Sequence, residues 1–114
     1  MKRTWTELRS EARTLESEID TKLAEYGRLG GGAPDVPRSD WMQEYNTSTD
    51  KLRDLLNRLE SLIAQMAGRP QHASWSYAIQ RYREIFLDYK QEFRRLRENL
   101  LANRERWELL RTVC

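Results

Sequence analysis

Apolar side chains recur along the first part of the chain at intervals of three or four residues. They are Trp5, Leu8, Ala12, Leu15, Ile19, Leu23 and Tyr26. These intervals place the side chains on one face of an α-helix, which has about 3.6 residues per turn. Thr4 and Glu7 have the spacing of a capping box, in which each side chain satisfies a free amide at the helix start. The pattern therefore predicts a helix over about residues 4–28.

A second segment carries a wider apolar face, with intervals of three and four residues in alternation. Its members are Met42, Tyr45, Thr49, Leu52, Leu56, Leu59, Ile63 and Met66, with Leu55 and Leu62 beside them. A face of this width allows one helix to contact two neighbours. Asp40 and Gln43 form a second candidate capping box. We expect this helix to cover about residues 40–67.

The third segment is the longest and continues the alternation almost to the last residue. Its seam comprises Ile79, Tyr82, Phe86, Tyr89, Phe93, Leu96, Leu100, Asn103, Trp107 and Leu110. The pattern predicts a helix over about residues 74–112. At a rise of about 1.5 Å per residue, this helix should extend about 10 residues or more beyond the other two.

The five Gly and three Pro residues divide the chain into these segments. They lie in two clusters, one from Gly27 to Pro37 and one at Gly68 and Pro70. Gly and Pro break regular structure, and the scarcity of β-branched residues favours helices over strands. Short links make successive helices antiparallel. We therefore expect an all-α fold, an up-down-up three-helix bundle with a longer third helix.

Composition narrows the class of protein. The chain has 114 residues and a net charge of +2, so its bulk charge does not point to nucleic acid. The single cysteine, Cys114, excludes a disulfide framework and a zinc site built on cysteines. No apolar run approaches the roughly 18 residues that span a bilayer, and the first residues lack a signal-peptide core. We expect a small soluble domain.

Candidate catalytic and metal-binding groups are few. His72 is the only histidine and has no Cys, Asp or Glu near it in the sequence, so we interpret it as a solvated loop residue. Gly30–Gly32 lacks the preceding strand and following Lys of a phosphate-binding loop and favours a flexible link. Acidic pairs such as Glu16 and Glu18 lie on polar helix faces. We expect no enzymatic activity, no metal and no cofactor.

The strongest charge asymmetry lies in the last predicted helix, between positions 94 and 111. Six arginines stand there against three glutamates: Arg94, Arg95, Arg97, Arg104, Arg106 and Arg111. Such a face is either a solvated surface or a binding site for an acidic protein, nucleic acid or anionic lipid. The aromatic residues lie on the apolar seam rather than between the arginines, which disfavours base stacking. The six arginines, with Trp107 and Leu110, form our candidate protein-interaction surface.

Two polar residues, Thr49 and Asn103, interrupt the apolar seams. A single polar residue in a seam often sets the register between helices. The alternative is that the side chain reaches solvent, and the sequence leaves both interpretations open.

A more specific pattern runs through the two outer helices. In the first it comprises Trp5, Leu8, Arg9, Ala12, Arg13, Leu15, Glu16 and Asp20. In the third it comprises Arg81, Arg83, Ile85, Asp88, Tyr89, Glu92, Phe93, Ala102, Arg104, Glu105, Arg106 and Leu109. These positions resemble the Golgi Qb-SNAREs, in particular the family of Golgi SNAP receptor complex member one. The middle helix is similar to the family only in its leucine-rich character.

The resemblance implies that residues 1–114 form an N-terminal regulatory three-helix (Habc) domain that faces the cytosol. In the family, a following SNARE motif joins a fusion complex with a Golgi syntaxin, a Qc-SNARE and an R-SNARE. A C-terminal anchor then holds the protein in the Golgi membrane. We expect the SNARE motif and the anchor to lie beyond Cys114, and this part of the chain alone to be soluble.

The resemblance also implies a process and a type of partner. The process is vesicle transport and membrane fusion between the endoplasmic reticulum and the Golgi and within the Golgi. A tether or a SNARE regulator would bind the three-helix domain itself, nucleic acid would not, and membrane contact would be through the anchor only. The competing hypothesis is an unrelated helical adaptor whose basic third helix binds nucleic acid or acidic membrane.

Overall fold

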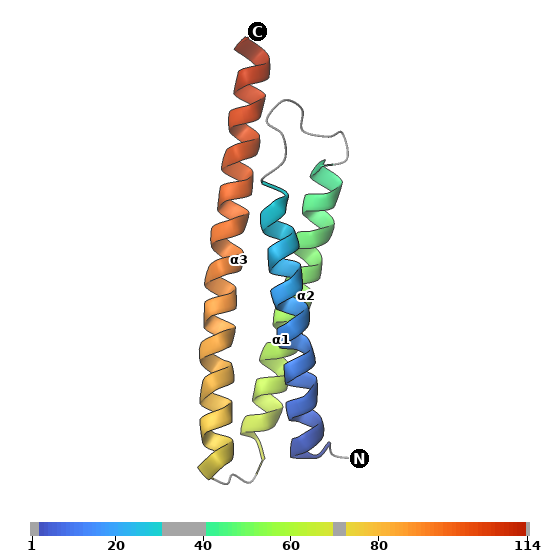
Figure 1. Cartoon of the computed structure of the whole chain (residues 1–114), viewed down its shortest axis with the longest axis vertical. Coiled ribbons are helices and arrows are strands. Elements are labelled where there is room, and N and C mark those ends of the chain that lie inside the picture. The colour runs from blue at the N-terminus through green and yellow to red at the C-terminus, as the bar shows by residue number, and fades with distance from the viewer. Residues whose placement is uncertain (1–2, 31–40, 70–72, 114) are drawn as a thin grey trace.

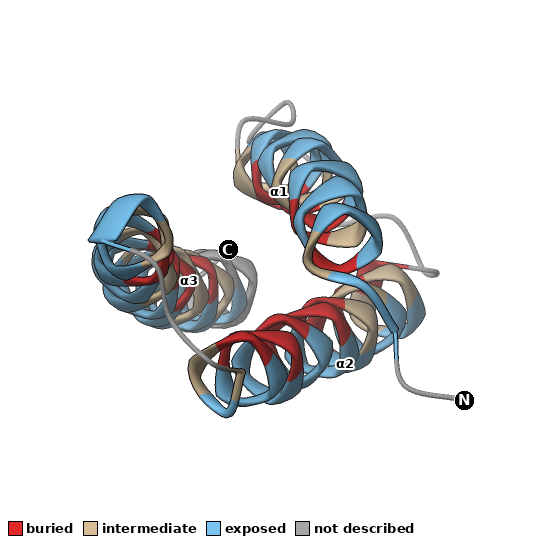
Figure 2. Ribbon diagram, turned by 90° about the horizontal axis from the view of Figure 1, so that it is seen from below, coloured by how far each residue is buried: buried red, intermediate tan, exposed pale blue. Residues whose placement is uncertain are grey.

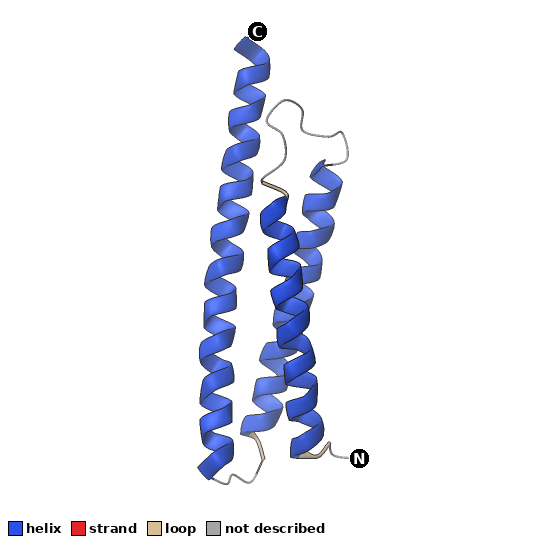
Figure 3. Cartoon of the chain, viewed as in Figure 1, coloured by secondary structure: helices blue, strands red, loops and turns tan. Residues whose placement is uncertain are grey.

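The computed structural model describes residues 3–30, 41–69 and 73–113, and these residues form helices and short turns without a strand (Figure 3). The helices are α1 (Trp5–Arg28), α2 (Trp41–Ala67) and α3 (Ala73–Val113). They run up, down and up, so that α1 begins and α3 ends at opposite ends of the molecule (Figure 1). The all-α three-helix bundle with a longer third helix is thereby confirmed.

Each helix bound lies within one residue of its predicted position. Several residues singled out in the sequence lie outside the described part of the chain: Gly31, Gly32, Asp40, His72 and Cys114. Within α3, the side chains at positions 107 and 110–113 also lie outside it.

The start of α1 is capped by Thr4. Its hydroxyl oxygen accepts a hydrogen bond from the backbone amide of Glu7 at 3.2 Å, and its hydroxyl lies 3.1 Å from a carboxylate oxygen of Glu7. Thr4 therefore provides a hydrogen-bond acceptor for one free amide of the first turn, which is the role of a capping residue. The next residue, Trp5, stacks on Trp75 with ring centroids 4.5 Å apart and ring planes 9° apart. This stack joins the beginnings of α1 and α3 at one end of the bundle.

The apolar faces of the three helices meet in one core, seen end-on in Figure 2. Helix α1 contributes Leu8, Ala12, Leu15, Ile19, Leu23 and Tyr26. Helix α2 contributes Trp41, Tyr45, Leu52, Leu55, Leu56, Leu59, Leu62, Ile63 and Met66, and α3 contributes Ile79, Tyr82, Tyr89, Phe93 and Leu100. Helix α3 packs less extensively against either neighbour than α1 and α2 pack against each other. Phe86 and Leu96, on the predicted seam of α3, are therefore only half-buried.

A polar pair lies inside this core. The hydroxyl groups of Tyr26 and Thr49 are 2.8 Å apart and hydrogen-bonded, and Thr49 is only 6% exposed. Sliding α2 by one turn along α1 would leave both hydroxyls buried without a partner, which costs free energy. Of the two interpretations that the sequence left open for Thr49, a side chain that reaches solvent or one that sets the register between helices, the structure supports the second.

Aromatic rings surround the polar pair and connect all three helices. The ring of Tyr26 lies 5.9 Å from that of Tyr45 and 5.6 Å from that of Phe93, measured between centroids. Tyr45 in turn stacks on Trp41, whose indole nitrogen donates a hydrogen bond to the carbonyl of Leu29 at 3.1 Å. Aromatic pairs at these distances contribute about 0.5–1.5 kcal/mol beyond their burial.

Helix α3 leaves the bundle after Leu100. Leu100 is 2% exposed, and a Cβ added to Gly30 at the end of α1 would lie 3.0 Å from its Cδ2 atom. Glycine therefore permits the close approach of the two segments. Among the later residues whose exposure the structure describes, none is buried, and Leu109 is 66% exposed. The end of α3 projects beyond the bundle in a molecule that measures 64 × 23 × 16 Å (Figure 1).

Candidate protein-interaction surface

The arginines of the predicted surface fall on two sides of α3. Successive residues of an α-helix are turned by about 100°, which places Arg94, Arg97 and Arg104 on one side. Arg95 and Arg106 lie on another side. The side chains of the remaining members, Trp107, Leu110 and Arg111, lie outside the part of the chain that the structure describes. The structure thus divides the arginines between two faces instead of joining them in one stripe.

Ion pairs within α3 neutralise part of this charge. They are Arg94–Glu98, Arg95–Glu92 and Arg104–Glu108, with nitrogen–oxygen distances of 3.2, 2.6 and 3.2 Å. Arg95 donates two hydrogen bonds to Glu92, and these bonds lower the pKa of that carboxyl group below its ordinary value. Because the pairs are exposed, they contribute little to the stability of the fold.

Arg97 is partly buried and, unlike the other described arginines of this surface, lies beside an aromatic ring. Its guanidinium carbon lies 5.6 Å from the centroid of the Phe93 ring. The negative face of an aromatic ring attracts a cation in this position. Arg97 therefore lies at the junction of α3 with the core.

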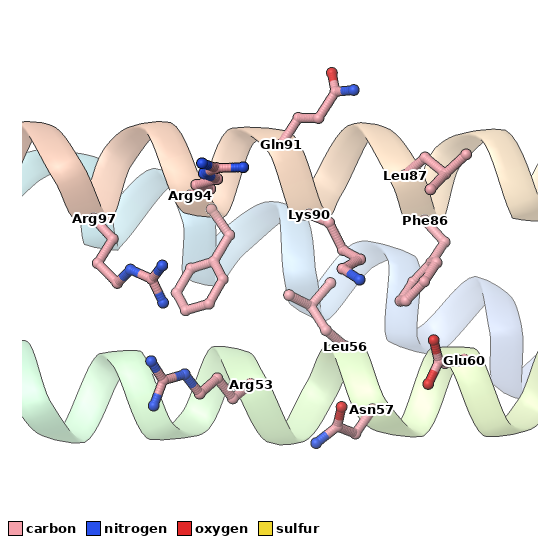
Figure 4. A pocket seen from close by; sticks show the side chains of 11 residues that line it. Arg53, Leu56, Asn57, Glu60, Phe86, Leu87, Lys90, Gln91, Arg94 and Arg97 are labelled. Carbon is pink, nitrogen blue, oxygen red and sulfur yellow. The ribbon is translucent and has the colours of Figure 1, made fainter.

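A groove between α2 and α3, which sequence reasoning missed, begins at Arg97. Its volume is about 460 Å³. Figure 4 shows the side chains that line it. Its lining is Arg53, Leu56, Asn57 and Glu60 of α2 and Phe86, Leu87, Lys90, Gln91, Phe93, Arg94 and Arg97 of α3. An adjoining hollow of about 380 Å³ shares Glu60, Phe86 and Leu87 and adds Ile63, Ala64 and Arg83. We call these two hollows together the α2–α3 groove.

The sequence contains a signal for this groove. Arg83, Lys90, Arg94 and Arg97 are spaced by seven, four and three residues, so they share one side of α3. Counting arginines only between positions 94 and 111 leaves out the first two members of this row and the facing Arg53 on α2. The spacing in the sequence reveals this row, but it does not reveal which side of α3 faces α2.

Two other features, a membrane-spanning helix and a metal site, are absent from the described residues. None of the helices in the described ranges combines the length and the low polarity needed to cross a membrane. Across the same ranges, no three His, Cys, Asp or Glu side chains come together in a way that could hold a metal ion. What the described surface presents to a partner is therefore charged and apolar side chains.

Comparison with known proteins gives the family. Residues 3–114 match the family described as the GOSR1 N-terminal domain. Similar proteins, each named Golgi SNAP receptor complex member 1, occur in Drosophila melanogaster (35% identical) and Caenorhabditis elegans (32%). These two matches cover 91% and 88% of this chain, and 50% and 49% of the relatives. The Homo sapiens protein of that name is 31% identical, over 96% of this chain and 54% of the relative.

The chain thus spans about half the length of the curated relatives it matches. No solved structure matches it. SNAREs are a non-enzymatic family, in agreement with the interpretation of the sequence. With a family match from residue 3 to residue 114, this chain belongs to the GOSR1 N-terminal domain family and is the N-terminal domain of a Golgi SNARE.

Proposed function

We propose that this domain is a regulatory protein-interaction module in vesicle transport from the endoplasmic reticulum to the Golgi and within the Golgi. The observation that carries the proposal is the family match over residues 3–114. In this proposal the remainder of the SNARE assembles with a Golgi syntaxin, a Qc-SNARE and an R-SNARE. A C-terminal anchor holds it in the Golgi membrane, with this domain on the cytosolic face.

The proposed contact for a tether or a SNARE regulator is the projecting end of α3. Leu101 and Leu109 are 37% and 66% exposed there, and Arg106 is also exposed. Apolar side chains outside a core often mark a protein contact. A partner bound at this end would sit next to whatever segment follows α3, and so could alter the assembly of the SNARE complex.

Charge reversal tests this contact. Arg104→Glu with Arg106→Glu, in the full-length protein, should slow association with a tether or regulator captured from a Golgi extract, because opposite charges steer association. Folding should change little, since neither Arg104 nor Arg106 is buried in the core. The control is the pair Arg9→Glu and Arg13→Glu, two exposed positions on α1.

The outcomes differ clearly. Weaker capture by the α3 variant alone, together with crosslinks from the partner to residues 99–106, supports the proposal. Equal capture by the α3 variant and the native protein contradicts it. Recovery of RNA in place of protein would favour the nucleic-acid-binding adaptor, which the comparisons do not support.

Removal of the domain tests the proposed process. A variant of the SNARE from which residues 1–114 have been deleted should support slower delivery of cargo from the endoplasmic reticulum to the Golgi, because a regulatory contact is lost. Assembly of the SNARE complex from purified components should persist. Unchanged delivery of cargo would mean that the domain has no regulatory role in this transport.

A further inference from the structure

We propose that the α2–α3 groove is the docking site for one amphipathic helix of a partner protein, with acidic residues along the edges of its apolar face. This inference goes beyond the proposed function, because it assigns a second binding surface that is separate from the projecting end of α3. The two surfaces can therefore be tested by different substitutions.

The floor of the groove is apolar. Leu56 and Phe93 belong to the core, while Phe86 is only half-buried and Leu87 is 56% exposed. Ile63 continues the apolar floor into the adjoining hollow. Covering this surface removes apolar area from water, which stabilises a complex. An apolar groove between two helices is the usual receptor for the apolar face of a third.

The dimensions of the groove fit a single helix. On α3 it extends from Arg83 to Arg97, which corresponds to about 21 Å at the rise of an α-helix. On α2 it extends from Arg53 to Ala64 along the same side. A helix of about four turns covers this length. Its addition would extend the three-helix bundle to a four-helix arrangement, a common packing of helices.

The charges around the floor specify the partner further. Arg53, Lys90 and Arg97 line the groove, and no carboxylate within the described residues forms an ion pair with any of them. In Figure 4, Lys90 and Arg97 extend from α3 toward α2, and the guanidinium group of Arg53 lies opposite that of Arg97. Glu60 is the single acidic residue of the lining.

Like charges on facing walls repel each other, and a bound carboxylate between them would relieve the repulsion. The groove therefore favours glutamate or aspartate beside the apolar face of the incoming helix. An uncharged or basic helix would bury the same apolar surface and leave the repulsion in place. This charge pattern is what selects an acidic helix as the occupant.

The test uses two synthetic helical peptides of about 14 residues with the same leucine positions at helical spacing. One peptide has Glu along both edges of the leucine face and the other has Lys. Fluorescence anisotropy with residues 1–114 should give a Kd of about 100 μM or tighter for the Glu peptide, and binding at least about tenfold weaker for the Lys peptide. In NMR spectra, shifted amides should cluster at residues 53–64 and 83–97.

Reversing the charge of two groove arginines distinguishes a direct effect on binding from a failure to fold. The double variant Arg53→Glu with Arg97→Glu should bind the Glu peptide at least about tenfold more weakly and bind the Lys peptide more tightly than the native chain does. An unfolded variant cannot show this gain. Leu87→Gln, at an exposed floor position, should weaken both peptides. The matched control, Arg9→Glu with Arg13→Glu on α1, should leave both Kd values unchanged.

Several results would overturn the proposal. Equal affinity for the two peptides, or failure of the double variant to gain affinity for the Lys peptide, would remove the argument from charge. Shifted amides confined to residues 101–106 would assign peptide binding to the projecting end of α3 alone. If full-length protein fails to bind the Glu peptide while residues 1–114 bind it, the occupant is a segment of the same protein. Self-association that the double variant abolishes would identify the occupant as a second copy.

Failure of this proposal is distinguishable from failure of the proposed function. The groove depends on Arg53 and Arg97, whereas the contact at the projecting end is tested at Arg104 and Arg106. Loss of peptide binding with normal capture of a tether or regulator would overturn the groove assignment only.

Discussion

Two tyrosine hydroxyls connect the helices at the level of single residues. Burial raises the pKa of Tyr26 to about 12, while its hydroxyl remains bonded to Thr49. Tyr89 lies 2.9 Å from a carboxylate oxygen of Asp20 and 3.2 Å from the carbonyl oxygen of Glu16. Burial and the bond to Asp20 raise the pKa of Tyr89 above its ordinary value. Both hydroxyls are therefore held in their neutral form in the folded state.

These shifts predict a loss of stability in alkali. A tyrosine whose pKa is raised by folding binds its proton more tightly in the folded state, so its contribution is complete below about pH 10 and declines above it. The free energy of unfolding, measured with urea, should fall between pH 8 and pH 11. Tyr89→Phe should be less stable than the native chain at pH 8, by about 1 kcal/mol, because it loses the bond to Asp20. Between pH 8 and pH 11, the free energy of unfolding of Tyr89→Phe should also fall less than that of the native chain. Parallel declines for the two proteins would contradict the assignment.

Leu56 tests whether the core is shared by the three helices. It is 6% exposed in the middle of α2, between the core and the α2–α3 groove. Leu56→Ala should lower the free energy of unfolding by about 2–5 kcal/mol, because it removes buried methyl groups and leaves a cavity. The same change at Leu109, which is 66% exposed, should cost less than about 0.5 kcal/mol. A loss below 0.5 kcal/mol at Leu56 in urea denaturation would show that the seam is not buried.

At the level of elements, α3 has two regions with different surroundings. From Ile79 to Leu100 its seam contributes to the core, and from Leu101 onward none of the residues with described exposure is buried. Local stability depends on such packing, so the two regions should open independently.

Hydrogen exchange measures this difference. Backbone amides from Asn103 to Thr112 should exchange much faster than those around Tyr89, because the turns around Tyr89 pack against the core, whereas none of the residues from 101 to 109 with a described exposure is buried. The measurement should be made at low protein concentration, so that self-association does not protect the projecting end. Equal protection of the two regions would show that the end of α3 is packed.

The elements themselves were predictable from the sequence, whereas their contacts were only partly so. Gly and Pro clusters and the alternation of apolar residues are local signals, and they gave the helices to within one residue. The partner of Thr49 is Tyr26, 23 residues earlier, and no local pattern could choose between this bond and solvent. The burial of Trp41 also depends on a distant group, the carbonyl of Leu29.

The candidate surface was less predictable for the same reason. The row Arg83, Lys90, Arg94 and Arg97 can be found from its spacing, but its meaning depends on how α3 is rotated relative to α2. That rotation follows from packing among all three helices. A count of charges along α3 therefore selected arginines on two different faces and overlooked Arg53, which lies across the groove.

For the whole molecule, the decisive feature is the unequal packing of its three helices. Helices α1 and α2 form the most extensive contact, and α3 is joined to α1 largely through long side chains. Examples are the Trp5–Trp75 stack and the contact of Tyr89 with Asp20. The groove lies between α2 and α3, whose contact is less extensive than that of α1 with α2. One long helix thereby carries both proposed binding surfaces, which lie at different heights along the molecule.

The common direction of α1 and α3 also determines how the domain resists mechanical force. A pull applied between Thr4, at the start of α1, and Asn99 on α3, next to Leu100 at the level where α1 ends, acts along both helix axes in opposite senses. It loads all contacts between the helices at once, in shear. A pull between Thr4 and Gly68 acts at one end only, where α1 begins and α2 has just ended, and peels the two helices apart turn by turn.

Forced unfolding follows the barrier along the direction of pulling. In optical tweezers, with cysteine handles at each pair of positions and Cys114→Ser to remove the native thiol, the Thr4–Asn99 geometry should require the larger force. Equal forces for the two geometries would mean that α1 and α3 share little load. If the expected order holds, tension applied along α3 while the start of α1 is held meets the domain along the more resistant of the two axes, so that the bundle stays folded at forces that would peel it apart in the other geometry.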